Sequence, residues 1–248
     1  MFQIILLIII GFFVGIFVLS MGGGGGSFYL GALSAVFGLA PAVAAATSIV
    51  TAIPPLLIGS WSYYREKQIN FKLGNRLLIS AIPSVVVGSL LAPLIPTKIY
   101  KIVIGLILVA LGVQTLYRLR GTSKDKPKTH SKWLSVFFGV ISGLMVGIAG
   151  LSGGGPIMAG LLIMGGSFME ASATSSYVLI CMAIVGAIFH TSGGNVDWTA
   201  GLGLMIGAMA GAAVAPHLMK VMTRGKGPLY LNIAMGVMIL VMGVKTMI

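Results

Sequence analysis

Acidic residues are the scarcest part of this sequence: the 248 residues include 4 Asp and Glu against 16 Lys and Arg. Charged residues make up 8% of the chain, whereas soluble domains carry about 25%. The sequence therefore lacks the polar surface that a water-soluble fold needs. Its apolar residues, 57% of the total, form long continuous runs and not the alternating pattern of a membrane β-barrel. These shortages leave an all-α polytopic membrane protein.

Cysteine and a basic leader are also missing. The single Cys181 excludes an internal disulfide. The first twenty residues have neither a basic stretch nor a cleavage-site pattern, so we expect a retained membrane span and not a secretion signal. The net charge of +12 lies almost wholly between apolar runs, which favours the positive-inside pattern over a nucleic-acid partner. The lipid bilayer is the expected partner, and no nucleic acid is expected.

The apolar runs predict about eight transmembrane helices, since one span needs about 20 residues. They cover residues 2–20, 42–64, 77–96, 99–117, 133–151, 168–192, 199–219 and 228–247. Two shorter segments, 27–39 and 155–166, follow glycine clusters and are expected to be half-helices or re-entrant pieces. The basic loops at 65–76 and 118–132 should be cytoplasmic, which places the N-terminus inside. On this count the basic loop 220–226 falls outside, against the same rule.

The sequence repeats itself in order. The paired segments are Gly11 to Ser20 with Gly143 to Ser152, Ala46-Thr47-Ser48 with Ala173-Thr174-Ser175, Ile69-Asn70-Phe71 with Val196-Asp197-Trp198, Ala92-Pro93 with Ala215-Pro216, and Gly105 and Gly112 with Gly236 and Gly243. They predict a first transmembrane repeat at 1–120, a basic cytoplasmic loop at 121–132 and a second repeat at 133–248. Pseudo-symmetric repeats with interrupted helices in corresponding places are typical of secondary transporters, whose binding sites lie at the interruptions.

The two glycine runs are the strongest site signal. Each lies where one apolar run stops and a short segment begins, and Pro156 suits the first turn of the second short segment. Helix N-termini carry unpaired N–H groups and about half a positive charge, so two such ends would bind an anion without a buried basic side chain. Serine and threonine hydroxyls on the following helices could donate as well. The expected binding residues are Gly23, Gly24, Gly25, Gly26, Ser27, Thr47, Ser48, Ser152, Gly153, Gly154, Gly155, Thr174 and Ser175.

Structural explanations of the same residues stay open. Glycine runs also permit close helix crossing, and hydroxyls in apolar helices often bond back to the preceding turn. A nucleotide-binding loop is excluded, because no Gly-Lys-Ser/Thr follows either run. Glu170 and His190 could carry a coupling proton; alternatively, Glu170 complements a helix dipole and His190 is a hydrogen-bonded interfacial side chain.

These motifs give the chain a family resemblance over essentially its full length. The Gly22–Gly26 run, the two Ala-Thr-Ser segments, the Tyr64–Asn70 loop and Gly153-Gly154-Gly155-Pro156 resemble the sulfite exporter TauE/SafE family of integral membrane proteins. The resemblance implies a multi-span permease of the cytoplasmic membrane that moves small sulfur-containing anions, such as sulfite or organosulfonates, outward. The first run has five glycines and no proline, unlike the second.

Other function classes remain as alternatives. A passive anion channel would need the same helix ends, and methionines at helical spacing, such as Met205 and Met209, could pass a soft metal such as Cu(I). Flexible core filling also explains those methionines. An enzyme is not expected, because the apolar runs contain no nucleophile–base pair or histidine cluster. We expect no cofactor and no resident metal, and the patterns predict no particular oligomeric state.

Overall fold

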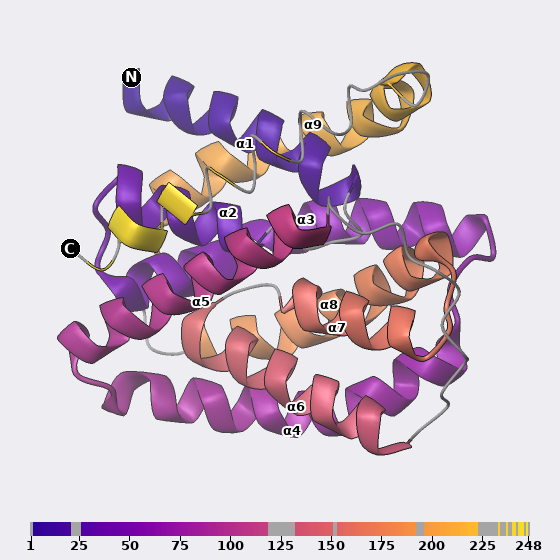
Figure 1. Ribbon diagram of the computed structural model, residues 1–248. Helices are drawn as coiled ribbons and strands as arrows, with labels where there is room; N and C mark the ends of the chain where they lie inside the picture. The colour runs from indigo at the N-terminus through magenta and orange to yellow at the C-terminus, as the bar shows by residue number, and fades with distance from the viewer. Residues whose placement is uncertain are drawn as a thin grey trace.

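The computed structural model describes residues 2–20, 26–118, 132–150, 153–191 and 196–222, together with separate residues between 233 and 247. In this part of the chain the structure is helical and contains no strand (Figure 1). The helices are α1 (Phe2–Ser20), α2 (Gly26–Gly31), a π-helical turn (Ala32–Val36), α3 (Pro41–Arg65), α4 (Phe71–Leu91), a 3-10 turn (Ala92–Leu94), α5 (Thr97–Arg118), α6 (Lys132–Ala149), α7 (Gly154–Ile163), α8 (Phe168–Thr191) and α9 (Trp198–Met222).

Most helices follow the predicted apolar runs, but α4 begins at Phe71, six residues before the run predicted at 77–96, so Lys72 and Arg76 lie in a helix and not in the expected loop. Three are long and apolar enough to cross a membrane by length and composition, namely Pro41–Arg65, Phe71–Leu94 and Met169–Thr191. Shorter apolar helices lie at Ile5–Ile16, Gly26–Val36, Lys101–Ala110, Trp133–Ala149, Gly154–Ile163 and Trp198–Val214. The chain is thus of the all-α membrane class. Most of the predicted run 228–247 lies outside the described residues.

Helices α3 and α8 pack against each other in opposite directions. Thr174, near the start of α8, bonds to Asn70, which follows α3. Thr47, near the start of α3, bonds to Asp197, which follows α8. We call the end where α3 finishes and α4 and α8 begin the basic face, because Arg65, Lys67, Lys72 and Arg76 cluster there. The other end is the opposite face.

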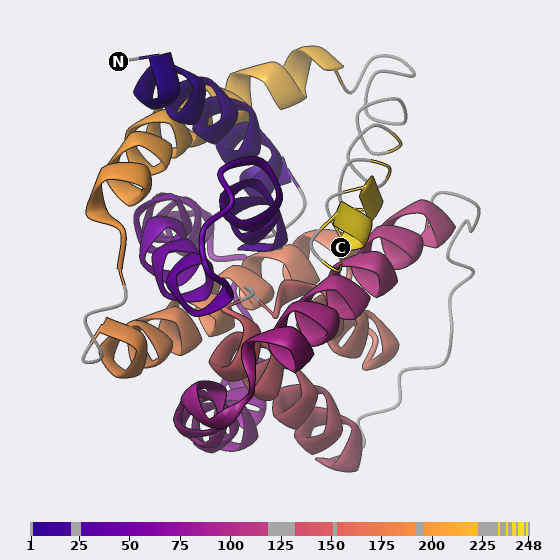
Figure 2. The ribbon, with the colours of Figure 1, turned by 90° about the vertical axis from the view of Figure 1, so that its left-hand side faces the viewer.

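Each pair of outer helices joins a helix that precedes the central loop, residues 121–132, to a helix that follows it. Glycines let α1 run beside α9: Cβ atoms at Gly11 and Gly15 would collide with the backbones of Leu204 and Ala208. The contact positions advance by four residues in the same direction on both helices, from Gly11 to Gly15 and from Leu204 to Ala208, so the helices are parallel. In Figure 2, α1 and α9 lie side by side at the top of the view, and α4 and α6 lie at the bottom. Such backbone contact is typical of small residues in membrane helix packing.

Helices α4 and α6 make the same kind of parallel pair. Cβ atoms at Gly139, Gly143 and Gly147 of α6 would meet the α4 backbone at Leu77, Ala81 and Val85. Each helix of this pair comes from a different part of the chain, as in the α1–α9 pair. The two parts are therefore interlocked along both outer edges.

These directions correct the expected sidedness of the ends. Helix α9 starts at the opposite face and finishes at the basic face with Met222, so the loop 220–226 begins on the same face as the other basic loops. Helix α1 runs parallel to α9 and therefore starts at the opposite face (Figure 1). The eight-span count was wrong in placing the N-terminus with the basic loops. Its error has a physical reason: a short helix after a glycine run can reverse direction, as α7 does where Gly153 and Gly160 lie against Ser142 and Phe138 of α6.

Candidate functional site

The second glycine run breaks an apolar helix in the interior. Helix α6 finishes at Ala149, and Gly150 follows with a φ of 67°. Gly153 has a φ of 61° and precedes the first residue of α7, Gly154. Glycine adopts this left-handed backbone at little cost, whereas other L-residues are strained there. Pro156 lies in the first turn of α7, where its missing N–H leaves no helical bond unmade.

Three side chains donate hydrogen bonds to the carbonyls around this break. Ser48 of α3 donates to the Gly150 carbonyl at 2.7 Å, and Ser142 donates to the Gly153 carbonyl at 3.0 Å. His190 Nε2 lies 2.8 Å from the Gly147 carbonyl. Since a carbonyl can only accept, Nε2 carries the proton in this contact. Backbone groups that a break frees inside a bilayer must find such partners.

The space beside the break is closed. A cavity of about 10 Å³ lies among α3, α6 and α8, lined by Ile49, Ala52, Leu56, Val146, Gly150, Leu179 and Ala183. A single water needs about 10–15 Å³, so the cavity holds one water at most and no polyatomic anion. A Cβ at Gly150 would also collide with the Ala45 backbone. Among the described residues, a ligand can therefore enter the space between α3, α6 and α8 beside Gly150 only if these helices move apart.

A polar cluster, which we call the Asn70 corner, joins α4 to α8 at the basic face. Asn70 caps α4, because its Oδ1 accepts from the Leu73 N–H at 3.1 Å. Its own N–H donates to Thr174 Oγ1 at 2.9 Å, and its Nδ2 donates to Glu170 Oε1 at 2.7 Å. Glu170 lies in the first turn of α8, and its N–H donates to Ser167 Oγ at 3.2 Å. An open hollow of about 600 Å³ leads to this corner from the basic face.

A second cluster, the Asp197 corner, joins α9 to α3 at the opposite face. Asp197 caps α9, with its Oδ1 accepting from the Ala200 N–H at 3.0 Å. Its N–H donates to Thr47 Oγ1 at 3.0 Å. Glycines allow both contacts: Gly201 of α9 lies against Thr47 Cγ2, and Gly74 of α4 lies against Thr174 Cγ2. The residues paired in the sequence thus make the same hydrogen bond, each between the two parts of the chain.

The expected binding residues fall into three groups. Gly23, Gly24, Gly25 and Ser152 lie outside the described residues. Gly26 and Ser27 are buried at the start of α2, and Gly154 is buried at the start of α7, which Gly153 and Gly155 flank. The four hydroxyls Thr47, Ser48, Thr174 and Ser175 are fully buried. Three of them hold backbone groups of neighbouring helices, as described above; the Ser175 hydroxyl has no partner among the described residues.

Both residues considered for proton coupling lie at the ends of α8. Glu170 is in its first turn, where a negative charge complements the helix dipole, and His190 is in its last turn. Each has a hydrogen-bond partner on another helix. Among the described residues, no group of three or more His, Cys, Asp or Glu side chains could hold a metal ion.

Sequence reasoning left four residues out of the site: Asn70, Asp197, Ser142 and Gly150. The first two stood in the paired segments, and Asn and Asp are preferred helix N-caps, so that signal could have placed them at helix starts. Nothing in the sequence indicated that Asn70 would bond to Thr174 and Asp197 to Thr47. Ser142 and Gly150 carry no local pattern that separates them from helix-packing residues.

Long apolar helices around buried hydroxyls and a broken helix define an integral membrane protein with a polar interior. Residues 7–246 match the family described as Sulfite exporter TauE/SafE, and the chain belongs to this family. It is similar to "Probable membrane transporter protein YjnA" of Bacillus subtilis, at 28% identity over 96% of this chain and 98% of that protein. It is also similar to "Probable membrane transporter protein YdhB" of the same organism, at 28% identity over 88% and 91% of the two chains. A "Probable membrane transporter protein" of Haemophilus influenzae is 27% identical over 86% and 84%. The chain is thus a membrane transporter of the TauE/SafE type.

Proposed function

We propose that this transporter is a permease that carries small sulfur-containing anions, such as sulfite or organosulfonates, out of the cell. The family description supports the substrate class. The observation that carries the proposal is the break between α6 and α7, which puts a helix N-terminus in an apolar interior where the described residues include no buried basic side chain. Backbone donors attract an anion less strongly than a buried lysine or arginine would, which allows its release.

The proposed anion site combines the α7 N-terminus with the equivalent start of the short segment at Gly26. Ser175 is the hydroxyl best suited to donate to the substrate, since it is buried and has no protein partner. Thr47, Ser48 and Thr174 shape the site by holding neighbouring backbone in place. A tetrahedral or pyramidal oxyanion would gain charge-assisted hydrogen bonds from these donors.

We further propose that residues 1–120 and 133–248 are inverted repeats on either side of the 121–132 loop. The bonds from Asn70 to Thr174 and from Asp197 to Thr47 support this. Asn70 and Asp197 are paired positions of the two repeats, and so are Thr47 and Thr174, so each bond joins one repeat to the other in the same way. The parallel α1–α9 and α4–α6 pairs support it in the same way. Repeats of opposite orientation around a central site are the usual basis of alternating access.

The positive-inside rule assigns the basic face to the cytoplasm, in a multi-pass arrangement in the cell membrane. Arg65, Lys67, Lys72 and Arg76 lie at that face, as do the helix ends that carry Arg118, Lys132 and Lys220, whereas Lys98 and Lys101 lie at the start of α5 at the other. An interior-negative potential of 100 mV then favours export by about 2.3 kcal/mol per anionic charge. Uniport driven by this potential needs no coupling ion. Glu170 and His190 are the side chains that would carry a proton if transport is coupled.

The two corners provide a gate on each side of the closed interior. In this proposal the Asn70 corner opens α4 from α8 to admit substrate from the cytoplasm through the adjoining hollow. The Asp197 corner opens α9 from α3 to release it outside. The 10 Å³ cavity between them is too small for the proposed substrate, so transport requires the helices around it to separate.

Flux in proteoliposomes tests the proposal. We expect saturable sulfite and sulfoacetate flux, and its loss in Gly154→Leu, because the added side chain fills the buried helix start. Gly186→Ala is the control: its Cβ would meet neighbours at 3.4 Å or more, an ordinary contact, so folding and flux should persist. Unfolding should be followed in both variants with a dye that reacts with the half-buried Cys181.

Three results would contradict the proposal. Unchanged flux in a folded Gly154→Leu protein would remove the glycine site. Flux that does not saturate would favour a passive channel. Copper uptake that depends on Met205 and Met209, with no anion flux, would favour the soft-metal permease.

A further inference from the structure

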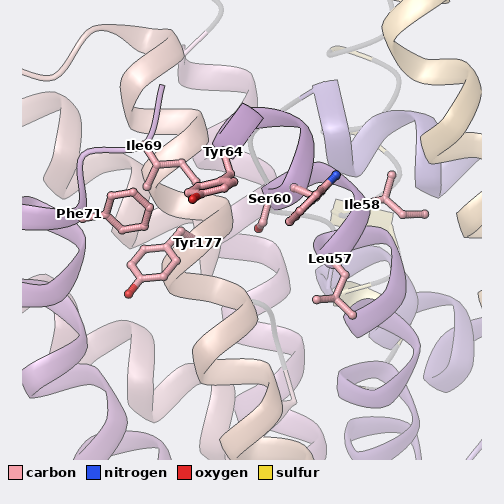
Figure 3. A pocket seen from close by; sticks show the side chains of 8 residues that line it. Leu57, Ile58, Ser60, Tyr64, Ile69, Phe71 and Tyr177 are labelled. Carbon is pink, nitrogen blue, oxygen red and sulfur yellow. The ribbon is translucent and has the colours of Figure 1, made fainter. Parts of the chain in front are cut away.

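An apolar groove lies at the basic-face end of the bundle, where α3 ends and α4 begins beside α8. Its volume is about 670 Å³, and Figure 3 shows the side chains that line it. They are Leu57, Ile58, Ser60, Trp61, Tyr64, Ile69, Phe71 and Tyr177. Phe71 stacks edge to face with Tyr64 on one side and with Tyr177 on the other, with ring centroids 6.2 and 5.1 Å apart. These rings hold the groove open.

The groove is suited to a hydrocarbon chain with one polar end. Trp61 is 64% exposed and Leu57 is 51% exposed, so the apolar wall faces outward from the bundle. The Tyr177 hydroxyl already donates to Asn75 Oδ1 at 2.9 Å. The Ser60 hydroxyl is buried and has no partner among the described residues. A buried hydroxyl beside an apolar wall could donate to the ester carbonyl of a lipid.

Two basic residues follow lining residues of this groove in the chain. Arg65 and Lys72 directly follow Tyr64 and Phe71 in the chain, and both are exposed. The described residues form no ion pair with either side chain, and the nearest acid along the loop is Glu66. A phospholipid whose acyl chain fills the groove therefore has its headgroup near two exposed basic residues, Arg65 and Lys72. An anionic headgroup complements them, and a zwitterionic headgroup does so less well.

We propose that the aromatic groove binds one anionic phospholipid of the leaflet at the basic face. One acyl chain lies over Leu57, Trp61 and Phe71, the Ser60 hydroxyl donates to an ester carbonyl, and the phosphate lies near Arg65 and Lys72. The proposal rests on the membrane orientation given under Proposed function, but not on the substrate. Since Tyr177 belongs to α8 and the other lining residues to α3, α4 and their loop, the lipid links the helices that the Asn70 corner joins.

Tryptophan quenching by brominated lipids tests this groove directly. Trp133→Phe with Trp198→Phe leaves Trp61 as the reporter. Trp61→Phe with Trp198→Phe leaves Trp133, which is 83% exposed at the basic-face end of α6 and serves as the matched control. Both proteins go into phosphatidylcholine liposomes that contain a small fraction of brominated phosphatidylglycerol. We expect the local fraction of brominated phosphatidylglycerol at Trp61 to exceed its fraction in the whole bilayer about fivefold or more. Attraction to roughly one basic side chain gives an enrichment of this size.

The controls separate the groove from general lipid contact. Arg65→Gln with Lys72→Gln should bring quenching of Trp61 down to the Trp133 level, and brominated phosphatidylcholine should not distinguish the two reporters. Equal quenching of Trp61 and Trp133 by the anionic lipid would overturn the proposal. So would a preference that survives the double substitution, or a Trp61 that neither lipid quenches because a second copy of the chain covers it. Sulfite flux measured in the same liposomes reports separately on the proposed transport.

Discussion

The Asn70 and Asp197 corners share one design and differ in strength. In both, a helix N-cap residue donates its backbone N–H to a buried threonine of another helix. The Asn70 corner adds a 2.7 Å bond from the amide Nδ2 to Glu170. The Asp197 corner lacks both partners of this bond. Asp197 has no side-chain N–H donor, and the position that corresponds to Glu170, four residues before the threonine, is Val43.

In the proposed transport cycle, this difference makes the two gates open with unequal ease. A hydrogen bond to a charged group contributes about 1.5–3 kcal/mol to stability. The extra bond therefore holds the basic-face gate more firmly than the opposite gate. In the proposed exporter, the gate that admits substrate is then the more firmly held one, while the exit gate is held by neutral hydrogen bonds, between Asp197 and Thr47 and between Thr51 and Gly201.

The largest effect should come from Asn70→Asp. This change keeps the N-cap acceptor but removes the donor to Glu170 and puts a second carboxylate beside it. We expect the free energy of unfolding to fall by about 2–3 kcal/mol, from the lost charged bond, measured by Cys181 labelling during denaturation. Asp197→Asn is the matched change in the other corner and should alter stability by less than about 0.5 kcal/mol.

A rescue variant makes the first prediction specific. Asn70→Asp combined with Glu170→Gln restores one donor and one acceptor with their roles exchanged, and should recover most of the lost stability. Equal stability of Asn70→Asp and Asp197→Asn would show that the Glu170 bond does not distinguish the corners.

A smaller effect is expected when each threonine loses its hydroxyl. Thr47→Val leaves the Asp197 N–H without an acceptor, which should cost about 1–3 kcal/mol. Thr174→Val should cost less, because the Asn70–Glu170 bond still joins α4 to α8. Thermal unfolding in detergent measures both, and Thr→Ser at each position keeps the acceptor as the control. A larger loss for Thr174→Val would reverse the ranking of the two gates.

The smallest effect compares the serines that follow the threonines. Ser48→Ala removes the bond to the Gly150 carbonyl and should lower stability by about 1 kcal/mol. Ser175→Ala removes no protein bond and should leave stability unchanged while it raises the KM for sulfite. Flux at a series of sulfite concentrations measures the KM, with Ser176→Ala as a neighbouring control. An unchanged KM in Ser175→Ala would remove this residue from the proposed substrate contacts.

The helices of this protein could be predicted from apolar run length, and their directions could not. The expected runs 42–64 and 168–192 became Pro41–Arg65 and Phe168–Thr191, because hydropathy and span length determine where a helix lies. A run does not say whether its neighbour crosses the membrane or turns back, which is why the side of the N-terminus was missed. The π-helical turn at Ala32–Val36 also has no sequence signal.

The candidate site was likewise predictable only in its local features. The glycine run predicted a break at Gly153–Gly155, and Gly153 has the left-handed backbone that glycine permits. Gly150, which has the same backbone at the end of α6, was not predicted. The partners of the hydroxyls depended on which helices meet, as the bonds from Ser48 to Gly150 and from Asp197 to Thr47 illustrate. Repeat pairing indicated that these residues were equivalent, and only the packed helices showed that the bonds exchange between the two parts of the chain.

The α1–α9 pair also constrains how the protein is made. Helix α1 leaves the ribosome first, yet the backbone that Gly11 and Gly15 contact belongs to α9, which is synthesised last among the described helices. Until then its glycine surface has only lipid or an insertion factor to cover it. A chain that stops before Trp198 would therefore leave the glycine surface of α1 without this partner, and we expect such truncated products to be degraded faster than the full chain.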